Sequence, residues 1–255
     1  MTSFKYETMR SEITAEGVRT ISLNRPSAMN AMNRLLIDEV SVAFDDANRD
    51  QDTRAIIFTG EGRAFCAGDD RHEHVHPETE EEARAFVDAI QRATVSIVMG
   101  AKPVVGAING WAVGGGFEWA INCDFPIWAE SAKAFFPEVS LNLFVTGAVT
   151  SILPSIVGPV KAREMLFLGN RYSAAELREI GVAWKVVPDD ELSREAKLSH
   201  RNLLHCSRGR GRSAFPAERP GASSRIGRAP SRHPRGNRSG PCRNPGQRAY
   251  PRRRA

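Results

Sequence analysis

The sequence predicts an α/β fold in which buried, mostly parallel strands alternate with helices. Short apolar runs rich in β-branched residues alternate with longer segments whose apolar residues recur at helical spacing. The central runs read as buried strands, as in parallel sheets that helices cover. With 255 residues, 41% of them hydrophobic, the chain can build one sizeable core.

The chain opens with two predicted strands, over residues 4–10 and 18–24, joined by a turn at Glu16-Gly17. A helix is expected over about residues 30–48, where apolar residues recur at helical spacing. A short buried strand follows over 54–60 and ends at a glycine turn.

The alternation then continues to about residue 190. We expect, in order, a helix over 79–98, a strand over 103–108, a short helix after Gly114–Gly116, a strand near 123–129, two or three helices between 146 and 180, and a last strand over 182–187. In the 79–98 helix, the apolar residues expected on one side are Ala83, Phe86, Val87, Ile90 and Ile97.

The charge divides the chain in two. Residues 201–255 hold fifteen arginines, no lysine and one acid, a net +14, so against a total of +5 residues 1–200 carry −9. Beyond about residue 198, Arg, Gly, Pro and Ser dominate and apolar residues are too sparse for a core. We therefore expect a folded domain over 1–197 and a disordered tail over 198–255.

Other features of the sequence bear on where the protein is located and on whether it binds a metal. The N-terminus has no apolar stretch behind a basic start, and no run approaches the roughly 18 apolar residues of a membrane span, so neither a signal peptide nor a membrane partner is expected. The four cysteines form no CxxC pair and indicate neither a disulfide framework nor a zinc site. A cytoplasmic location follows. His72, His74 and His76 alternate, but a polar loop over a cleft is favoured over a metal site.

Residues 63–70 form the first candidate site segment. Gly68 can adopt backbone angles closed to other residues, which would let the amide of Asp69 point into a cleft. Taken alone, the segment is more typical of an ordinary turn after a strand.

Residues 108–118 form the second segment, in which a strand ends, three glycines follow and a helix begins. The start of a helix offers unpaired N–H groups and the positive end of its dipole, which suit an anion or an oxygen that gains negative charge during a reaction. A flexible loop or a phosphate loop are the alternatives. No Gly-Lys-Ser/Thr and no dinucleotide-type glycine register are present, which argues against nucleotide loops.

Glu118 and Glu138 form the third candidate. Glu118 lies in the first turn of the glycine-led helix, and Glu138 follows the apolar Phe135-Phe136-Pro137. An apolar flank raises the pKa of a carboxyl group and suits general acid catalysis. Taken alone, either glutamate is more typical of a solvated surface residue than of a catalyst.

In this order and at these separations, the segments resemble the crotonase superfamily, the enoyl-CoA hydratase/isomerase family, over about residues 5–195. The motifs that carry the resemblance are Leu23-Asn-Arg-Pro26 with Asn30-Ala31, Phe65–Asp70, Gly110–Glu118 with Cys123-Asp124, and Ala134–Val139.

The resemblance implies a spiral of ββα units, a helical C-terminal part used in forming trimers or hexamers, and an acyl-CoA thioester as ligand, with no cofactor besides. It implies an oxyanion hole made by the backbone amides of Asp69 and Gly115, and Glu118 and Glu138 as the catalytic pair. The implied substrate-binding residues are Ala28, Ala67, Gly68, Asp70, Arg71, His72, Gly114 and Gly116.

With both glutamates present, the resemblance favours adding water to an α,β-unsaturated acyl-CoA, or eliminating it. Isomerisation or another acyl-CoA reaction, and non-catalytic acyl-CoA binding, are the alternatives. Two departures bear on the substrate: the segment 141–150 is bulkier than in typical hydratases, and the acid Asp69 stands at an oxyanion position.

The tail does not continue the amphipathic helix that begins at 191–197, so stable oligomers are in doubt. Our favoured hypothesis is a reading-frame shift near residue 197 in a GC-rich gene, since shifted GC-rich codons give this mixture of Arg, Pro, Gly, Ser and Ala. Nucleic-acid binding by the basic tail is the less favoured alternative, because Phe215 and Tyr250 are its only aromatic residues for stacking.

Overall fold

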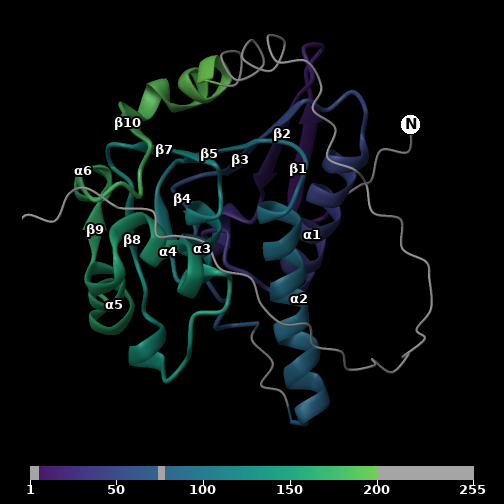
Figure 1. Cartoon of the computed structure of the whole chain (residues 1–255). Helices are drawn as coiled ribbons and strands as arrows, with labels where there is room; N and C mark the ends of the chain where they lie inside the picture. Colours follow the sequence, from purple (N-terminus) through teal and green to yellow (C-terminus); the bar gives the residue numbers. More distant parts are fainter. Residues whose placement is uncertain (1–5, 74–77, 200–255) are drawn as a thin grey trace, which may run out of the picture. The chain divides into compact units, whose positions relative to one another are not determined.

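Two sheets form the framework of residues 6–73 and 78–199, the parts of the chain that the computed structural model describes. The larger sheet has the strand order β1-β2-β3-β5-β7-β10 (Figure 1). Its strands are β1 (Met9–Ile13), β2 (Val18–Leu23), β3 (Ala55–Gly60), β5 (Val104–Ile108), β7 (Phe125–Ala129) and β10 (Lys185–Val187). Only β1 is antiparallel to its neighbour; the remaining pairs in this sheet are parallel, as predicted.

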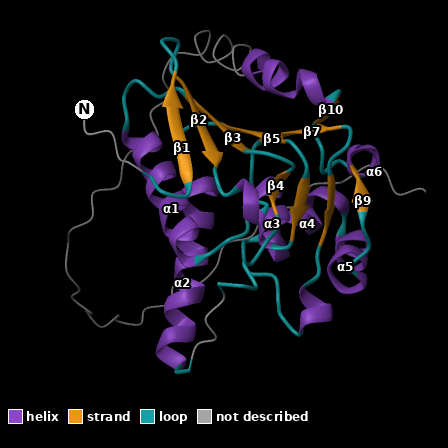
Figure 2. Cartoon of the chain, turned by 180° about the vertical axis from the view of Figure 1, so that it is seen from behind, coloured by secondary structure: helices purple, strands orange, loops and turns teal. Residues whose placement is uncertain are grey.

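The smaller sheet has the order β4-β6-β8-β9. Its strands are β4 (Ala64–Cys66), β6 (Trp111–Val113), β8 (Lys133–Phe135) and β9 (Tyr172–Ser173). The chain alternates between the sheets, since β3, β5 and β7 of the large sheet are each followed by β4, β6 and β8 of the small one. Helices follow the first two of these pairs, so the predicted spiral of ββα units is confirmed (Figure 2).

Helices follow the strands along the chain, and some of them begin at side-chain caps. They are α1 (Arg34–Arg49), α2 (Glu80–Val98), α3 (Gly115–Ile121), α4 (Val149–Val157), α5 (Pro159–Leu168) and α6 (Ala174–Glu179), with short 3-10 turns η1 (Pro26–Ala28), η2 (Glu138–Leu141) and η3 (Asp189–Glu191). Asn33 caps α1, and Thr79 with Glu82 forms a reciprocal capping box on α2. Residues 192–199 are also helical.

The core lies between the sheets and the helices. Phe58 of β3 contacts Phe44 of α1 and Phe65 of β4 edge-on, each at 5.1 Å between ring centroids. The ring of Trp119 in α3 lies 5.9 Å from that of Phe58. One phenylalanine therefore joins both sheets and two helices, and the side chains of all four residues are buried.

The structure corrects several sequence predictions. The first strand lies at Met9–Ile13 instead of 4–10, and the helix predicted over 30–48 begins only at Arg34. The helix starts late because Asn30 has a positive φ and Asn33 is extended and caps the helix through Leu36. On α2, the side chain of Val87 is 42% exposed, because the first half of this helix extends past the core.

The short strands β4, β6, β8 and β9 were not predicted. The predictions for His74, His76 and residues 200–255, including the frame shift and nucleic-acid binding, concern residues outside the described ones. Among the helices that are described, none combines the length and the apolar character needed to cross a bilayer.

Candidate active site

The small sheet brings the three predicted segments to one edge. Its strands β4, β6 and β8 are adjacent and parallel, with Cys66 opposite Ala112 and Val113 opposite Phe135. The segments Ala67–Asp70, Gly114–Gly116 and Phe136–Glu138 each follow directly after one of these strands. Because parallel strands end at the same edge, all three segments lie side by side, at the place where α/β sheets commonly bind ligands.

Two glycines hold the first two segments against each other. Gly68 has φ +84°, and a Cβ atom there would come within 2.7 Å of the carbonyl oxygen of Val113. A Cβ on Gly116 would overlap the carbonyl oxygen of Cys66. Only glycine allows this approach, so the segment that carries Asp69 lies against the start of α3 at Gly115, and the two predicted oxyanion donors lie on neighbouring segments.

Gly115 is the first residue of α3. The backbone N–H groups of Phe117 and Glu118 already donate to the carbonyl oxygen of Gly114, at 2.8 and 3.0 Å. The N–H groups of Gly115 and Gly116 precede the first helical bond and have no acceptor within the helix. Asp69 is exposed and forms an isolated parallel bridge with Met32, whose Sδ lies beside Gly115.

Aromatic packing draws the two glutamates together. The rings of Phe117 and Phe136 are stacked, with centroids 4.6 Å apart and 30° between the planes. The N–H of Gly114 donates to the carbonyl oxygen of Phe135 at 3.0 Å. Glu118 and Glu138 adjoin these contacts and are 3% and 8% exposed, so neither is the solvated surface residue that was the alternative.

Glu118 accepts two backbone hydrogen bonds, from the N–H groups of Thr146, at 3.2 Å, and Gly147. Two other side chains hold these residues in place: Gln91 donates to the carbonyl oxygen of Thr146, and Asn122 donates to that of Gly147. Burial raises the pKa of Glu118, and the two N–H donors oppose that rise by favouring the carboxylate.

Glu138 has fewer partners. Among the described residues its Oε2 atom has no hydrogen-bond partner, although it is buried, while Oε1 lies close to Gly114. Burial raises the pKa of Glu138 to about 7, and the negative charge of Glu118 raises it as well. The two carboxyl groups therefore interact electrostatically, and Glu138 is the one suited to carry a proton near neutral pH.

The remaining predicted residues take different places. Asp70 is buried and its carboxylate forms an ion pair with Arg25 at 2.7 Å, away from the surface. Arg71 and His72 are exposed; Ala28, in η1, and Ala67 are half-buried. Gly114, Gly115 and Gly116 lie at the edge already described.

A pocket of about 300 Å³ borders Glu138. Its wall comes from the loop after η2 and from α4 and α5, and is mostly apolar. Among its lining residues are Leu143, Phe144, Val145, Pro154, Leu166 and Phe167. Within residues 6–73 and 78–199, no three His, Cys, Asp or Glu side chains are placed to hold a metal ion.

Comparison with known proteins decides the family. The sequence model of the enoyl-CoA hydratase/isomerase family matches residues 13–213. The chain belongs to the enoyl-CoA hydratase/isomerase family. The resemblance seen in the motifs is thereby confirmed, and the chain is an enzyme of this acyl-CoA-processing family.

The chain is similar to individual members of the family in sequence, and to a solved member in fold. It is 36% identical over 217 residues to a crotonyl-CoA hydratase of Syntrophomonas wolfei, covering 85% of this chain and 83% of the relative. It is 32% identical over 194 residues to the 1,2-epoxyphenylacetyl-CoA isomerase of Escherichia coli, covering 74% and 73%. The crystal structure of an enoyl-CoA hydratase from Bacillus anthracis matches with a TM-score of 0.74 and 34% identity, over 78% of this chain and 77% of that one.

Several residues of the site were not found from the sequence. Gly147 had a signal, because it is the only glycine in the bulky segment 141–150. Thr146, Gln91 and Asn122 had none, since they act through hydrogen bonds to or from the backbone that no motif marks.

Proposed function

We propose that this enzyme adds water across the double bond of an α,β-unsaturated acyl-CoA thioester, or catalyses the reverse elimination. The observation that carries the proposal is the pair of buried, interacting carboxyl groups of Glu118 and Glu138, next to the segment after β4 that carries Asp69 and the start of α3 at Gly115. The crotonyl-CoA hydratase relative supports the same reaction.

In this mechanism the thioester oxygen lies against the backbone amides of Asp69 and Gly115. These donors stabilise the negative charge that develops on the oxygen as an enolate forms, and removing one such donor typically costs about 100- to 1,000-fold in rate. The positive end of the α3 dipole acts in the same direction.

The two glutamates divide the proton transfers. Glu118, held by two N–H donors, takes a proton from water as the water oxygen bonds to the β-carbon. Glu138, protonated, gives its proton to the α-carbon as the enolate collapses. Glu118 then holds the proton and Glu138 is the anion, and solvent restores the starting state. Such acid–base catalysis contributes about 100- to 10,000-fold.

A second candidate reaction is double-bond isomerisation. Both oxygens of Glu118 already accept backbone hydrogen bonds, whereas Oε2 of Glu138 has no partner among the described residues. Glu138 alone could remove a proton from one carbon and return it to another. Because the family includes isomerases as well as hydratases, this is the reaction to test beside hydration.

The pocket beside Glu138 is the proposed acyl site. Its volume of about 300 Å³ is at the small end for ligand pockets, which suits an acyl chain and not a whole CoA molecule. Its apolar wall, with the rings of Phe144 and Phe167, favours an apolar chain or an aromatic group.

The test is turnover of crotonyl-CoA and cinnamoyl-CoA, followed by loss of the conjugated thioester absorbance and by the mass of the product. Hydration adds the mass of one water, whereas isomerisation leaves the mass unchanged. Glu118→Gln and Glu138→Gln should each lose most of the activity, and Glu12→Gln, an exposed glutamate of β1, should retain it. Measurable binding of CoA esters without any turnover would instead support the binding-only alternative.

The proposed proton donor also predicts the pH dependence. Because Glu138 must be protonated for hydration and its pKa is about 7, kcat/KM should fall as the pH rises through about 7. A stopped assay over about pH 6 to 9 measures this. A rate that stays constant across that range would rule out Glu138 as the acid.

Oligomeric state, cytoplasmic location and the independence of any cofactor remain predictions.

A further inference from the structure

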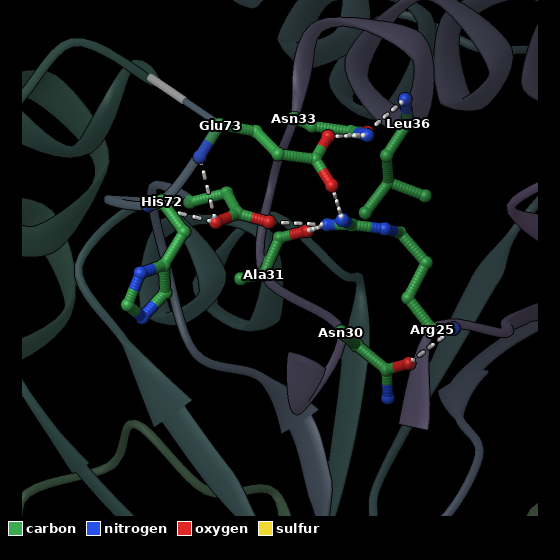
Figure 3. Close-up of polar contacts among 8 residues, drawn as sticks. Arg25, Asn30, Ala31, Asn33, Leu36, His72 and Glu73 are labelled. Carbon is green, nitrogen blue, oxygen red and sulfur yellow. Dashed lines mark hydrogen bonds and ion pairs between the residues drawn. The ribbon is translucent and has the colours of Figure 1, made fainter. Parts of the chain in front are cut away.

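Arg25 is the centre of a partly buried polar cluster that the proposed mechanism does not use. Its side chain is 14% exposed, and its guanidinium donates to three acceptors (Figure 3). These are the carbonyl oxygen of Ala31, the carboxylate of Asp70 at 2.7 Å, and the carboxylate of Glu73 at 2.7 Å.

Asp70 carries the contact into the loop 67–73. One carboxylate oxygen pairs with Arg25, and the other accepts the N–H groups of His72, at 3.1 Å, and Glu73, at 3.3 Å. The side chain is only 5% exposed, so removing its cationic partner would leave a buried charge without compensation.

The other side of the cluster is the segment 29–33, just before α1. Backbone hydrogen bonds join it to the loop: Ala67 N–H to the carbonyl oxygen of Met29, Met32 N–H to that of Gly68, and Asp70 N–H to that of Met32. Asn33 adds a side-chain hydrogen bond to Glu73 at 2.6 Å and caps α1 through Leu36 (Figure 3). Asp69 lies between these attachments.

We propose that Arg25 is a positioning residue for the reaction: its guanidinium fastens the loop 67–73 to the segment 29–33 and thereby fixes the backbone of Asp69 opposite Gly115. Arg25 touches no reacting atom. The inference rests on the proposed function, because the position of Asp69 matters to catalysis only if its amide stabilises the thioester oxygen.

Arg19 provides a matched control. Its side chain is 19% exposed and likewise has three partners, with Asp50 at 2.6 Å, Thr53 at 2.8 Å and Ser11 at 3.1 Å. It lies at the amino end of β2, whereas Arg25 follows the carboxyl end. If Arg25 only stabilised the fold, substituting either arginine should lower kcat to a similar extent.

The experiment compares Arg25→Met, Arg25→Lys and Arg19→Met with the unmodified full chain, below the melting temperature of each. In Arg25→Met we expect kcat for the enoyl-CoA that the unmodified enzyme turns over to fall about 10- to 100-fold, with KM changed less than about threefold. Arg25→Lys should be intermediate, because an ammonium group keeps the charge but cannot bridge three acceptors. Arg19→Met should keep kcat within about threefold.

Amide hydrogen exchange gives a readout that does not need turnover. Residues 67–73 should exchange faster in Arg25→Met than in Arg19→Met, and Asp70→Asn should show the same change if Arg25→Met does not fold. Unchanged exchange in this loop, or an equal loss of kcat in both arginine variants, would overturn the proposal. If the unmodified chain turns over no enoyl-CoA, the proposed function fails separately and the exchange comparison alone decides whether Arg25 holds the loop.

Discussion

Replacing Glu138 by glutamine should make the protein more stable at pH 8 while removing most of its activity. Burial raises the pKa of Glu138 from 4.5 to about 7. Below 4.5 both the folded and the unfolded chain hold the proton. As the pH rises from 4.5 through 7, the unfolded chain releases it while the folded chain keeps it, so the free energy of unfolding falls across this window. Glutamine cannot ionise and removes that loss.

The size of the effect follows from the two pKa values. The difference between 4.5 and about 7 corresponds to about 3 kcal/mol, at about 1.36 kcal/mol per pH unit. The side chain is 8% exposed, so solvent screens little of it. In a domain of this size about 3 kcal/mol corresponds to a melting temperature higher by roughly 6 to 12 °C at pH 8.

Thermal unfolding followed by circular dichroism at about pH 5 and pH 8 measures the change, with Glu12→Gln as the exposed control. The advantage of Glu138→Gln over the unmodified chain should be under about 1 kcal/mol at pH 5 and about 3 kcal/mol at pH 8. An equal advantage at both pH values would show that the carboxyl is not held protonated by burial, and the assignment of Glu138 as the acid would lose its basis.

Two further changes test the geometry around the site. Gly116→Ala should lower the free energy of unfolding by about 3 kcal/mol or more, because the added Cβ would overlap the backbone oxygen of Cys66. In Gly115→Ala the Cβ meets only the flexible side chain of Met32, at 3.0 Å, so the loss should be about 1 kcal/mol. Equal losses of the two variants in urea denaturation would contradict this. Phe144→Ala should raise kcat/KM for octenoyl-CoA relative to crotonyl-CoA by at least about threefold, because it enlarges the pocket beside the catalytic pair, and an unchanged ratio would place the acyl chain elsewhere.

The large sheet was predictable because its central strands are long enough to appear in the sequence as continuous apolar runs. β3 has six residues and is largely buried, and β5 has five and is entirely buried. The bounds of both strands fall within one residue of the predicted ones. The start of α2 was equally readable, since Thr79 and Glu82 stand at capping-box spacing and form both hydrogen bonds.

The small sheet was not predictable for the opposite reason. β4, β6 and β8 have three residues each, too few for an alternating pattern to appear. Asp70 shows the same limit at the site. Its place in a ligand-site motif indicates binding, but its partner Arg25 lies 45 residues earlier in the sequence, and only the fold shows that its carboxylate is buried against an arginine.

The convergence of Glu118 and Glu138 is a consequence of that small sheet. Between them the chain completes α3, crosses the large sheet as β7 and returns as β8, which lies parallel to β6. Each glutamate follows the carboxyl end of its strand by a few residues, and the stacked rings of Phe117 and Phe136 fix the separation of the two segments. Phe117 directly precedes Glu118, and Phe136 lies two positions before Glu138. The ring contact that brings the two carboxyl groups together therefore also shields them from water. The proximity of the pair and the raised pKa of Glu138 therefore have one structural cause, and a substitution that loosens the ring stack should weaken both.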